Sequence, residues 1–595
     1  MSAGDFYIEE EEAKTKGLGL RLLPKVWPFF SRYKLRVGLT GLMVLASSGL
    51  GLLGPLLIKH AIDANIVQRD MPGLWRTALL YLAVQLAVFG LGYFQRIQLT
   101  IVSEKAVADL KEKLYAHILK LPVSFFDRNP VGRLITRTES DTEALKQLFA
   151  TTAIVITQDL VMLVGMSVVM AIVNWRLFLI IVVLFPPILY GFAYFQKRIR
   201  PTYLKIRRMV AELNNFITET MRGLPVVQAM NRQEFFAGKM GGLNKEKFGY
   251  ESRVWGLMAR IWMLWDLGES LGTVLVMGFG GFWALKGMIT IGGLFMFYSY
   301  ISRVFQPIRG LSDQINVMQR ASASAERMFG IFDTAPEPSG QLSLPDRKFS
   351  DAVRIEHVNF AYEGRETVLK DINLEVRKGE KVALVGETGS GKTSIVGLLL
   401  KFYEVQQGRI TIDGLDLREL DNLSLRRRVG FVPQEVILFP GTVLDNLRLF
   451  DETVNEEQVH SAARRARIHE RILQFPQGYA TNLVERGINL SLGERQLLAF
   501  ARALVFDPEI LILDEATSSV DPHTEHLIQE GLEELLKDRT AIIVAHRLAT
   551  IEMVDRIVVV HKGQIIQEGS HRELVAQDGY YSRLYHLQYL AKEAV

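Results

Sequence analysis

Long apolar stretches fill the first half of the chain and constrain its fold more than any other feature of the sequence. A helix needs roughly 20 apolar residues to cross a bilayer, and stretches of about that length recur between residues 37 and 316. One or two spans would suffice for a passive anchor, so a larger set favours a pathway or a moving gate. We predict six helical spans, at residues 37–58, 77–101, 152–173, 177–196, 261–285 and 291–316.

The distribution of basic residues predicts how these spans are oriented. Lys and Arg cluster before the first span, after the second and after the fourth, whereas the links after the first, third and fifth spans are short and carry few. Basic loops tend to stay on the cytoplasmic side, so we predict a multi-pass cell-membrane protein with both termini in the cytoplasm. The long regions at about 102–150 and 197–260 then extend into the cytoplasm as helices.

Two groups of side chains in or near the last two spans are candidates for a substrate cavity. Charges inside a membrane are costly and often functional. A charge in the cytoplasmic part of a long helix would instead be exposed to water and need no special role. Aromatic side chains suit a hydrophobic substrate, although facing lipid is their commoner fate. Both possibilities stay open from the sequence. The charged candidates are Arg260, Asp266, Glu269 and Arg303, and the aromatic ones are Trp262, Trp265, Phe295, Phe297 and Tyr298.

Two features of the composition exclude other classes of protein. The chain has no cysteine, which excludes disulfides, thiol catalysis and cysteine-ligated metals. Its formal net charge of +4 over 595 residues lacks the strong basic excess of nucleic-acid-binding proteins. We therefore predict no nucleic-acid partner.

The character of the sequence changes near residues 335–350, where a stretch rich in Pro, Ser and Gly is typical of a linker. Beyond it, the apolar runs shorten to strand length and alternate with helical segments. This alternation indicates an α/β domain with a largely parallel sheet. The stretch RIVVVHKGQIIQEG has a hairpin-like pattern around Lys562–Gly563.

The stretch GETGSGKTS, residues 386–394, matches the phosphate-loop pattern G-x-x-x-x-G-K-[ST]. It lies between a predicted strand, KVALVG, and a predicted helix, KTSIVGLLL, which is the context that the pattern requires. Glycines allow backbone N–H groups to approach phosphate oxygens, and the helix N-terminus adds a positive partial charge. Lys392 can reach the outer phosphates, and the Thr393 hydroxyl can bind Mg²⁺. The candidate nucleotide-binding residues are Gly386, Glu387, Thr388, Gly389, Ser390, Gly391, Lys392, Thr393 and Ser394.

The stretch ILILDE, residues 510–515, supplies the carboxylates that the phosphate loop lacks. Asp514, at a strand end, can hold the hydration shell of the metal ion. Glu515 can polarise a water molecule for attack on the γ-phosphate. Alone this run would be weak evidence, but paired with the phosphate loop it indicates ATP hydrolysis with Mg²⁺.

Together these motifs resemble those of an ABC exporter half-transporter, in which a membrane domain precedes a nucleotide-binding domain. The resemblance covers about residues 20–590 and implies a six-span α-helical transmembrane domain plus an α/β P-loop NTPase domain, the type IV ABC transporter architecture. It also implies two cytoplasmic coupling regions, which match residues 121–141 and 214–236. The expected organisation is an acidic tail at 1–19, a transmembrane domain at 20–334, a linker at 335–350 and a nucleotide-binding domain at 351–595.

The resemblance assigns further residues of the nucleotide site. Tyr362 matches the aromatic residue that stacks on adenine, a contact worth roughly 1–3 kcal/mol. Gln434 matches the glutamine that binds the metal ion and relays to the membrane domain. The family's D-loop falls on Ser518–Asp521, with Asp521 as a nucleotide-site residue. His546 matches the histidine that contacts the γ-phosphate, where its imidazole could stabilise developing charge.

The signature stretch NLSLGERQ, residues 489–496, departs from the family's usual LSGGQ. Ser491 and Gly493 remain and are the positions suited to contact a γ-phosphate, but Leu492 replaces a glycine and Glu494 replaces a glutamine. Leucine fits only if its backbone avoids the region reserved for glycine. Glutamate near a polyphosphate is unfavourable unless a neighbour such as Arg495, or Mg²⁺, offsets its charge.

The resemblance implies a dimer, because family members hold ATP between the phosphate loop of one chain and the signature of the other. Two interpretations of the altered signature stay open. The chain could form a homodimer with two working sites. Alternatively, it could be one subunit of a heterodimer whose second site hydrolyses weakly.

The function implied is ATP-driven export of a hydrophobic or amphipathic substrate, drug or lipid-like, by alternating access. The alternative is a membrane-bound ATPase that gates a channel or regulates a partner without moving cargo. Import is less favoured, because importers of this superfamily commonly carry the ATPase on a separate chain. Peptide processing is also less favoured, because no thiol protease domain precedes the first predicted span.

Overall fold

The computed structural model describes residues 23–344, 348–364, 366–484, 487–514, 522–545 and 548–586. The chain folds as two compact units. The first, which we call the helical unit, comprises Met1–Leu119 and Val131–Thr334. The second, the α/β unit, comprises Lys120–Pro130 and Ala335–Val595.

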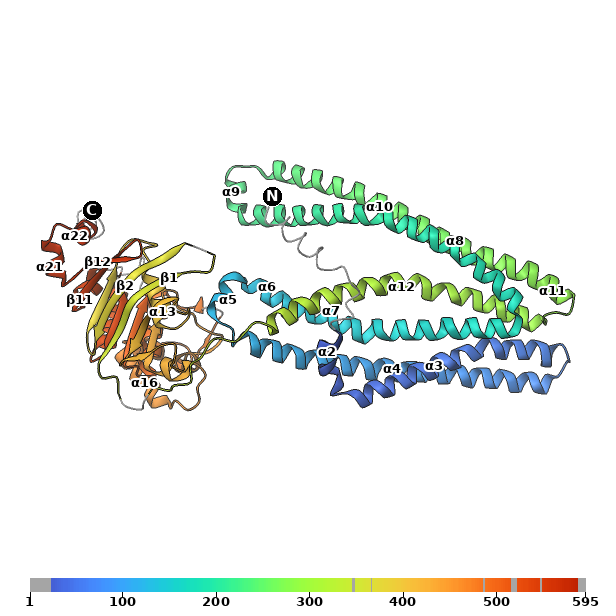
Figure 1. Cartoon of the computed structure of the whole chain (residues 1–595), viewed down its shortest axis with the longest axis horizontal. Coiled ribbons are helices and arrows are strands. Elements are labelled where there is room, and N and C mark those ends of the chain that lie inside the picture. The colour runs from blue at the N-terminus through green and yellow to red at the C-terminus, as the bar shows by residue number, and fades with distance from the viewer. Residues whose placement is uncertain are drawn as a thin grey trace. The chain divides into compact units, whose positions relative to one another are not determined.

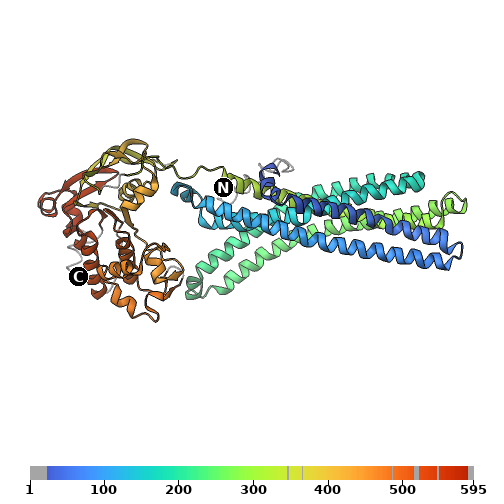
Figure 2. The ribbon, with the colours of Figure 1, turned by 90° about the horizontal axis from the view of Figure 1, so that it is seen from below.

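The helical unit is built from long helices that pack along their lengths. Helices α3 and α4 run side by side, and so do α8 and α10 (Figures 1 and 2). The α-helices of this unit are α2 (Leu23–Ser31), α3 (Lys34–His60), α4 (Met71–Ile118), α6 (Val131–Thr136), α7 (Thr142–Gln147), α8 (Ala153–Arg222), α9 (Leu224–Ala229), α10 (Gln233–Leu275), α11 (Gly281–Leu285) and α12 (Ile291–Phe332), and π-helical segments lie at Ala61–Ile66, Arg137–Asp141, Leu148–Thr152 and Val276–Gly280.

Helix α8 is two helices joined at Asn174. The backbone of Asn174 is extended, with φ −157° and ψ 97°, and its side-chain oxygen accepts a hydrogen bond from the backbone N–H of Leu177 at 3.1 Å. This is the geometry of an N-cap, which starts a new helix. The predicted short link after the third span is therefore confirmed.

Three helical segments of the described residues are long and apolar enough to cross a membrane: Lys34–Ile66, Met71–Ile118 and Val131–Arg222. The third contains the break at Asn174, so the predicted first to fourth spans all lie within these segments. The predicted fifth and sixth spans lie in α10, α11 and α12, which are helical but more polar and fall outside the three segments.

Some aromatic cavity candidates turn out to be core residues of the helical unit. Trp265 and Phe297 are 2% and 0% exposed, and the Trp265 ring lies edge-on to the ring of Phe305, 6.2 Å between centroids. Within a single chain, these two side chains therefore show neither of the two possibilities that the sequence left open, a cavity or a lipid-facing position. The other three candidates stay exposed, namely Trp262, Phe295 and Tyr298.

The α/β unit contains a six-stranded sheet in the order β12-β11-β3-β10-β9-β6, of which Figure 1 labels β11 and β12. All neighbours in this sheet pair in parallel except β12, which is antiparallel to β11. Strands β9 and β10 are buried along their whole length, as expected of a parallel sheet covered on both faces. The strands are β3 (Lys381–Val385), β6 (Val429–Val432), β9 (Ile510–Asp514), β10 (Thr540–Val544), β11 (Arg556–His561) and β12 (Gln564–Gly569).

A four-stranded antiparallel sheet, in the order β2-β1-β4-β5, and a short β7-β8 pair complete the strands of this unit that the structure describes. The predicted hairpin between β11 and β12 is confirmed. Its turn residues Lys562 and Gly563 both have positive φ, 47° and 82°, which is the requirement of a tight type I′ turn. The strands are β1 (Ala352–Ala361), β2 (Thr367–Arg377), β4 (Gln407–Ile412), β5 (Leu415–Asp416), β7 (Gly441–Thr442) and β8 (Asn482–Leu483).

Helices pack around these sheets and alternate with the strands along the chain, so the predicted α/β fold with a largely parallel sheet is confirmed. One short helix, α5 (Val123–Arg128), comes from the first half of the sequence yet belongs to this unit. The others are α13 (Lys392–Leu399), α14 (Asn422–Arg428), α15 (Val443–Leu447), α16 (Glu456–Arg465), α17 (His469–Leu473), α18 (Leu492–Val505), α19 (Pro522–Leu536), α20 (Leu548–Glu552), α21 (His571–Ala576) and α22 (Tyr580–Tyr585), with a 3₁₀ turn at Gly478–Ala480.

Candidate nucleotide-binding site

Several predicted site residues follow parallel strands of the same sheet. The phosphate loop follows β3, Asp514 is the last residue of β9, and Gln434 comes two residues after β6. Because these strands run in parallel, their carboxyl ends meet at one edge of the sheet, where ligands of α/β folds commonly bind. The fold therefore brings the predicted phosphate, metal and relay residues to one edge.

Two glycines of the phosphate loop occupy positions that exclude a side chain. Gly391 has a φ of +109°, a conformation that L-residues avoid, and a Cβ atom there would lie 2.6 Å from Leu369 Cδ2. At Gly386, a Cβ atom would run into the backbone carbonyl oxygen of Val560. The backbone N–H groups of the loop can thus approach an anion closely.

Lys392 is buried inside the loop, at 5% exposure. Its ammonium group donates hydrogen bonds to the backbone oxygens of Gly386 and Glu387, both at 2.8 Å, and to Ser390 Oγ at 3.3 Å. Burial lowers the pKa of Lys392, and the charges of Asp514 and Glu387 act in the opposite direction. A cation held in this way keeps the loop wrapped around the position that an anion would take.

Tyr362 directly follows strand β1 and lies against the helix that begins at the phosphate loop. Its hydroxyl shares a 2.9 Å hydrogen bond with Ser394 Oγ in α13. Its ring packs perpendicular to that of Tyr403, 5.1 Å between centroids. The ring is therefore fixed beside the phosphate loop, as stacking on adenine would require.

Tyr403 connects this corner to α5 and was missed by the sequence analysis. Its hydroxyl donates a hydrogen bond of 2.7 Å to Asp127 Oδ2, and Arg128, also in α5, pairs with Glu363 at 2.6 Å. Burial and the Asp127 carboxylate raise the pKa of Tyr403. The predicted coupling region thus contacts Glu363, which follows Tyr362 in the sequence, and Tyr403, whose ring packs against that of Tyr362.

The predicted metal ligands are oxygen donors, which suit Mg²⁺. They are the Thr393 hydroxyl, the Gln434 side-chain carbonyl and the Asp514 carboxylate, of which only Asp514 is buried. Among the described residues no three His, Asp or Glu side chains gather closely enough to hold a metal ion by themselves. The donor set therefore fits a Mg²⁺ ion that also takes ligands from phosphate oxygens and water.

The signature stretch forms the capped N-terminus of helix α18. Ser491 is the N-cap, and its Oγ accepts a hydrogen bond from the backbone N–H of Glu494 at 3.2 Å. The Glu494 carboxylate accepts one from the backbone N–H of Ser491 at 2.7 Å, which completes a capping box. Leu492 is the first residue of α18, so its backbone is helical and does not require glycine.

The charge of Glu494 is offset by a residue other than the one expected. Arg495 donates to the backbone oxygens of Gly487 and Leu490, at 3.3 and 2.9 Å, whereas Arg471 pairs with Glu494 at 2.5 Å. Burial raises the pKa of Glu494, but the hydrogen bonds from Arg471 and Ser491 outweigh it and hold the pKa below its ordinary value. An arginine therefore offsets the charge as expected, but it is Arg471 and not Arg495, the example that the sequence offered.

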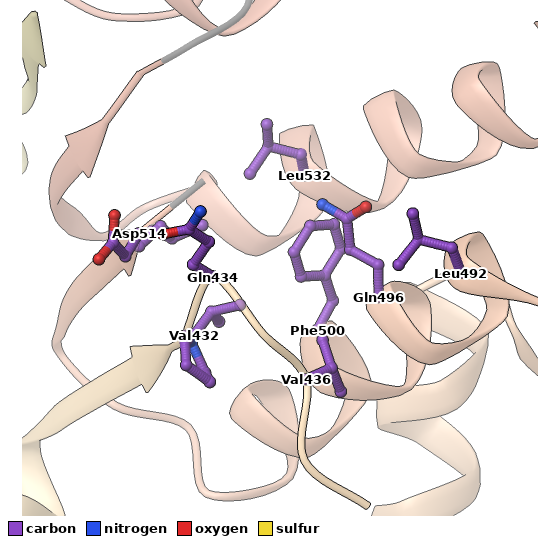
Figure 3. Close-up of a pocket in the computed structure, with 10 residues that line it drawn as sticks. Val432, Gln434, Val436, Leu492, Gln496, Phe500, Asp514 and Leu532 are labelled. Carbon is purple, nitrogen blue, oxygen red and sulfur yellow. The ribbon is translucent and has the colours of Figure 1, made fainter. Parts of the chain in front are cut away.

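One pocket is lined both by predicted metal-site residues and by side chains of the signature helix α18 (Figure 3). Gln434 and Asp514 lie at one end and Leu492 at the other, with Gln496 and Phe500 between them. The side chain that replaces the family's glycine thus lines a pocket of its own chain.

Comparison with models of known families shows which family this chain belongs to. The family model described as "ABC transporter transmembrane region" matches residues 37–308, and the family model described as "ABC transporter" matches residues 369–518. The chain is an ABC transporter. It is therefore an ATPase coupled to transport, with ATP as its nucleotide and a membrane-spanning region fused to it.

Relatives of this ABC transporter match it over most of their length. The uncharacterized ABC transporter ATP-binding protein YfiC of Bacillus subtilis is 34% identical over 95% of this chain and 94% of its own. The ATP-dependent lipid A-core flippase of Syntrophus aciditrophicus is 34% identical over 90% and 89%. A Bacillus subtilis protein named "Probable multidrug resistance ABC transporter ATP-binding/permease protein YheH" is 35% identical over 84% and 75%.

Some predicted site residues of the transporter lie outside the described residues. They are Glu515, the stretch Ser518–Asp521 and His546. The neighbouring strands β9 and β10 are described up to Asp514 and Val544 and pair there in register. The roles of Glu515, Asp521 and His546 stay predictions.

Proposed function

We propose that this ABC transporter exports a hydrophobic or amphipathic substrate, drug or lipid-like, by alternating access of a dimer. The observation that carries the proposal is the arrangement of the α/β unit, in which the phosphate loop and the capped signature are separate helix N-termini. Both present backbone N–H groups that lack intrahelical acceptors, and both suit an anion. ATP bound at one chain's loop and the other chain's signature would join the two chains.

Each chain contributes defined groups to hydrolysis. Lys392 and the loop amides bind the β- and γ-phosphates, and Tyr362 stacks on the base. Glu515 orients and deprotonates the attacking water, while His546 stabilises charge on the γ-phosphate. Mg²⁺, when bound by Thr393, Gln434 and Asp514, would neutralise charge on the phosphates.

Closure of the dimer around ATP would be transmitted to the membrane region through the predicted coupling regions. ATP favours the joined state because it makes contacts there that the open state lacks, and only such a difference can shift the balance. In the α/β unit, Asp127 and Arg128 of α5 contact Tyr403 and Glu363 around the adenine position. Movement of this corner would therefore pull on α5.

The second coupling region supports a dimer. The α8–α9–α10 tip exposes Val226, Met230 and Phe235 at 63%, 68% and 61%, in a part of the helical unit that the charge distribution places in the cytoplasm. Apolar side chains exposed to water commonly mark an interaction surface. A second half-transporter, identical or different, would cover them.

The substrate class and orientation follow from the membrane region. Relatives include proteins named as a lipid A-core flippase and a multidrug resistance transporter, which supports an amphipathic cargo. Exposed aromatic side chains in the last two predicted spans, with Arg260 and Asp266 exposed and Glu269 and Arg303 half-buried, are the candidate cavity residues. We propose that the chain comprises a tail at 1–19, a transmembrane domain at 20–334, a linker at 335–350 and a nucleotide-binding domain at 351–595. Both termini and the nucleotide-binding domain would lie in the cytoplasm.

Transport in sealed proteoliposomes tests this function. The purified full chain, reconstituted with any subunit that accompanies it, should accumulate a fluorescent amphipathic dye or flip a labelled lipid only with ATP. The Glu515→Gln variant should bind ATP and stop both turnover and transport. ATP turnover without any flux would instead support the gating alternative, and undiminished turnover in Glu515→Gln would refute the catalytic assignment.

A further inference from the structure

The N-terminus of α18 carries a negative charge that the proposed ATP site must accommodate. Glu494 follows Gly493 directly, and Gly493 is one of the two signature residues expected to meet the γ-phosphate. An unopposed carboxylate there would repel the polyphosphate. This inference rests on the proposed function, because it requires a second chain to present ATP to the signature.

Both oxygens of the Glu494 carboxylate are engaged within its own chain. Oε2 accepts the backbone N–H of Ser491 at 2.7 Å, and Oε1 accepts Nε of Arg471 at 2.5 Å. The Glu494 side chain is 13% exposed and that of Arg471 is 53% exposed. The ion pair thus forms at the rim of the signature, with the carboxylate turned inward.

Arg471 lies in a different helix, α17, and two residues just beyond the end of that helix hold its side chain in place. Its Nη1 donates to Gln474 Oε1 at 3.0 Å, and its guanidinium lies 5.5 Å from the centroid of the Phe475 ring. A cation fixed by its surroundings loses little conformational freedom when it pairs. Arg471 can therefore neutralise Glu494 before any nucleotide arrives.

We propose that Arg471 is a positioning residue of the ATP site, which neutralises Glu494 and keeps it in the capping box so that the signature can receive a γ-phosphate. A glutamine at position 494 would make the same capping box without a charge. Arg471 is therefore required for ATP affinity only while residue 494 is glutamate. This dependence separates the proposed role from simple structural support.

The test is a double-mutant cycle on the KM for ATP, with the full-length transporter in lipid. Arg471→Ala in the wild-type background should raise the KM about tenfold, because it leaves a negative charge beside the phosphate position. The same substitution in the Glu494→Gln background should change the KM less than about twofold. Arg471→Lys, which keeps the charge, should raise the KM only slightly.

Two controls separate charge from structure. Arg464→Ala removes an exposed ion pair to Glu457 on the neighbouring helix α16 and should leave the KM unchanged. The Arg471→Ala defect should shrink as salt rises from about 0.05 M to about 0.5 M, because truncating Arg471 opens the Glu494 carboxylate to solvent and salt screens solvent-exposed charges. A KM defect of equal size in both backgrounds would show that Arg471 only supports the fold.

The inference and the proposed function can fail separately. Wild-type protein that does not hydrolyse ATP, or Lys392→Ala protein that still does, would overturn the proposed function and with it this inference. If Lys392→Ala is inactive while Arg471→Ala has a wild-type KM, the ATPase assignment stands and the role of Arg471 is refuted.

Discussion

The phosphate loop and the signature are both helix N-termini of the α/β unit, but they are built in different ways. Helix α13 follows Gly391, whose φ of +109° is open only to glycine at low cost. Helix α18 follows Ser491, whose φ of −64° and ψ of 161° any residue can adopt. The loop depends on glycine, whereas the signature depends on a cap.

This difference explains where the chain keeps the family pattern and where it departs from it. At the phosphate loop, a side chain would meet Leu369 or the backbone at Val560. At the signature, Leu492 takes an ordinary helical conformation, and Glu494 finds hydrogen-bond partners on both oxygens. The departures at Leu492 and Glu494 are thus compatible with a formed signature. They do not by themselves require a degenerate second site.

The largest effect is expected at Lys392. Replacing it with alanine removes a buried cation that braces the loop through three hydrogen bonds and that would bind the outer phosphates. ATP turnover should fall about 100-fold or more, as measured by phosphate release from the reconstituted protein. Turnover near the wild-type rate would show that the loop is not the nucleotide site, and would contradict the comparison of the loop with the signature.

Gly391→Ala should be the next most damaging change. The alanine would be strained by about 1–3 kcal/mol at this φ, and its Cβ would crowd Leu369. The apparent affinity for a fluorescent ATP analogue should fall about tenfold or more, with a lower unfolding temperature. Gly364→Ala is a matched control, because Gly364 also has positive φ, 71°, with open space around it. Equal loss of nucleotide affinity in both variants would mean that the crowding at Gly391 does not matter.

The part of the site that could be predicted from the sequence is the part encoded locally. Neighbouring residues alone were enough to predict the phosphate loop, the strand that ends in Asp514 and the Lys562–Gly563 turn. The structure contains the strand before the loop, the strand that ends in Asp514 and the turn between β11 and β12. The link at Asn174 was local as well. Apolar runs similarly identified the first four predicted spans.

Contacts between distant parts of the sequence could not be predicted. Arg471 pairs with Glu494 across 23 positions of the sequence. Arg495 is adjacent to Glu494 in the sequence, but its side chain donates hydrogen bonds to backbone oxygens instead. Tyr403 meets Asp127 across 276 positions. Burial of Trp265 depends on helix packing in the same way. An acidic residue in the signature signals that some basic partner is needed, but the sequence does not say which arginine or lysine lies beside Glu494.

Ser491→Ala tests whether the signature depends on its cap. The change removes the acceptor for the Glu494 N–H and should lower the free energy of unfolding of the α/β unit by about 1 kcal/mol, with a moderate rise in the KM for ATP. Ser491→Thr keeps the hydroxyl and serves as the control. Thermal unfolding and ATPase kinetics on the same preparations measure both effects. If alanine and threonine behave alike, the cap is not what forms the signature.

The smallest effect is expected from Leu492→Gly, which restores the family residue. Leu492 is 42% exposed and lies at the first position of α18, so the variant loses part of an apolar contact and gains backbone freedom in the unfolded chain. Together these should cost at most about 1 kcal/mol of stability, and the KM for ATP should change less than about threefold, because the backbone conformation is already one that glycine shares. Unfolding temperatures and ATPase kinetics measured beside Gly391→Ala make the comparison direct. A large gain in turnover on restoring glycine would mean that Leu492 impairs the signature, and would favour the heterodimer in which this chain's signature serves the weaker site.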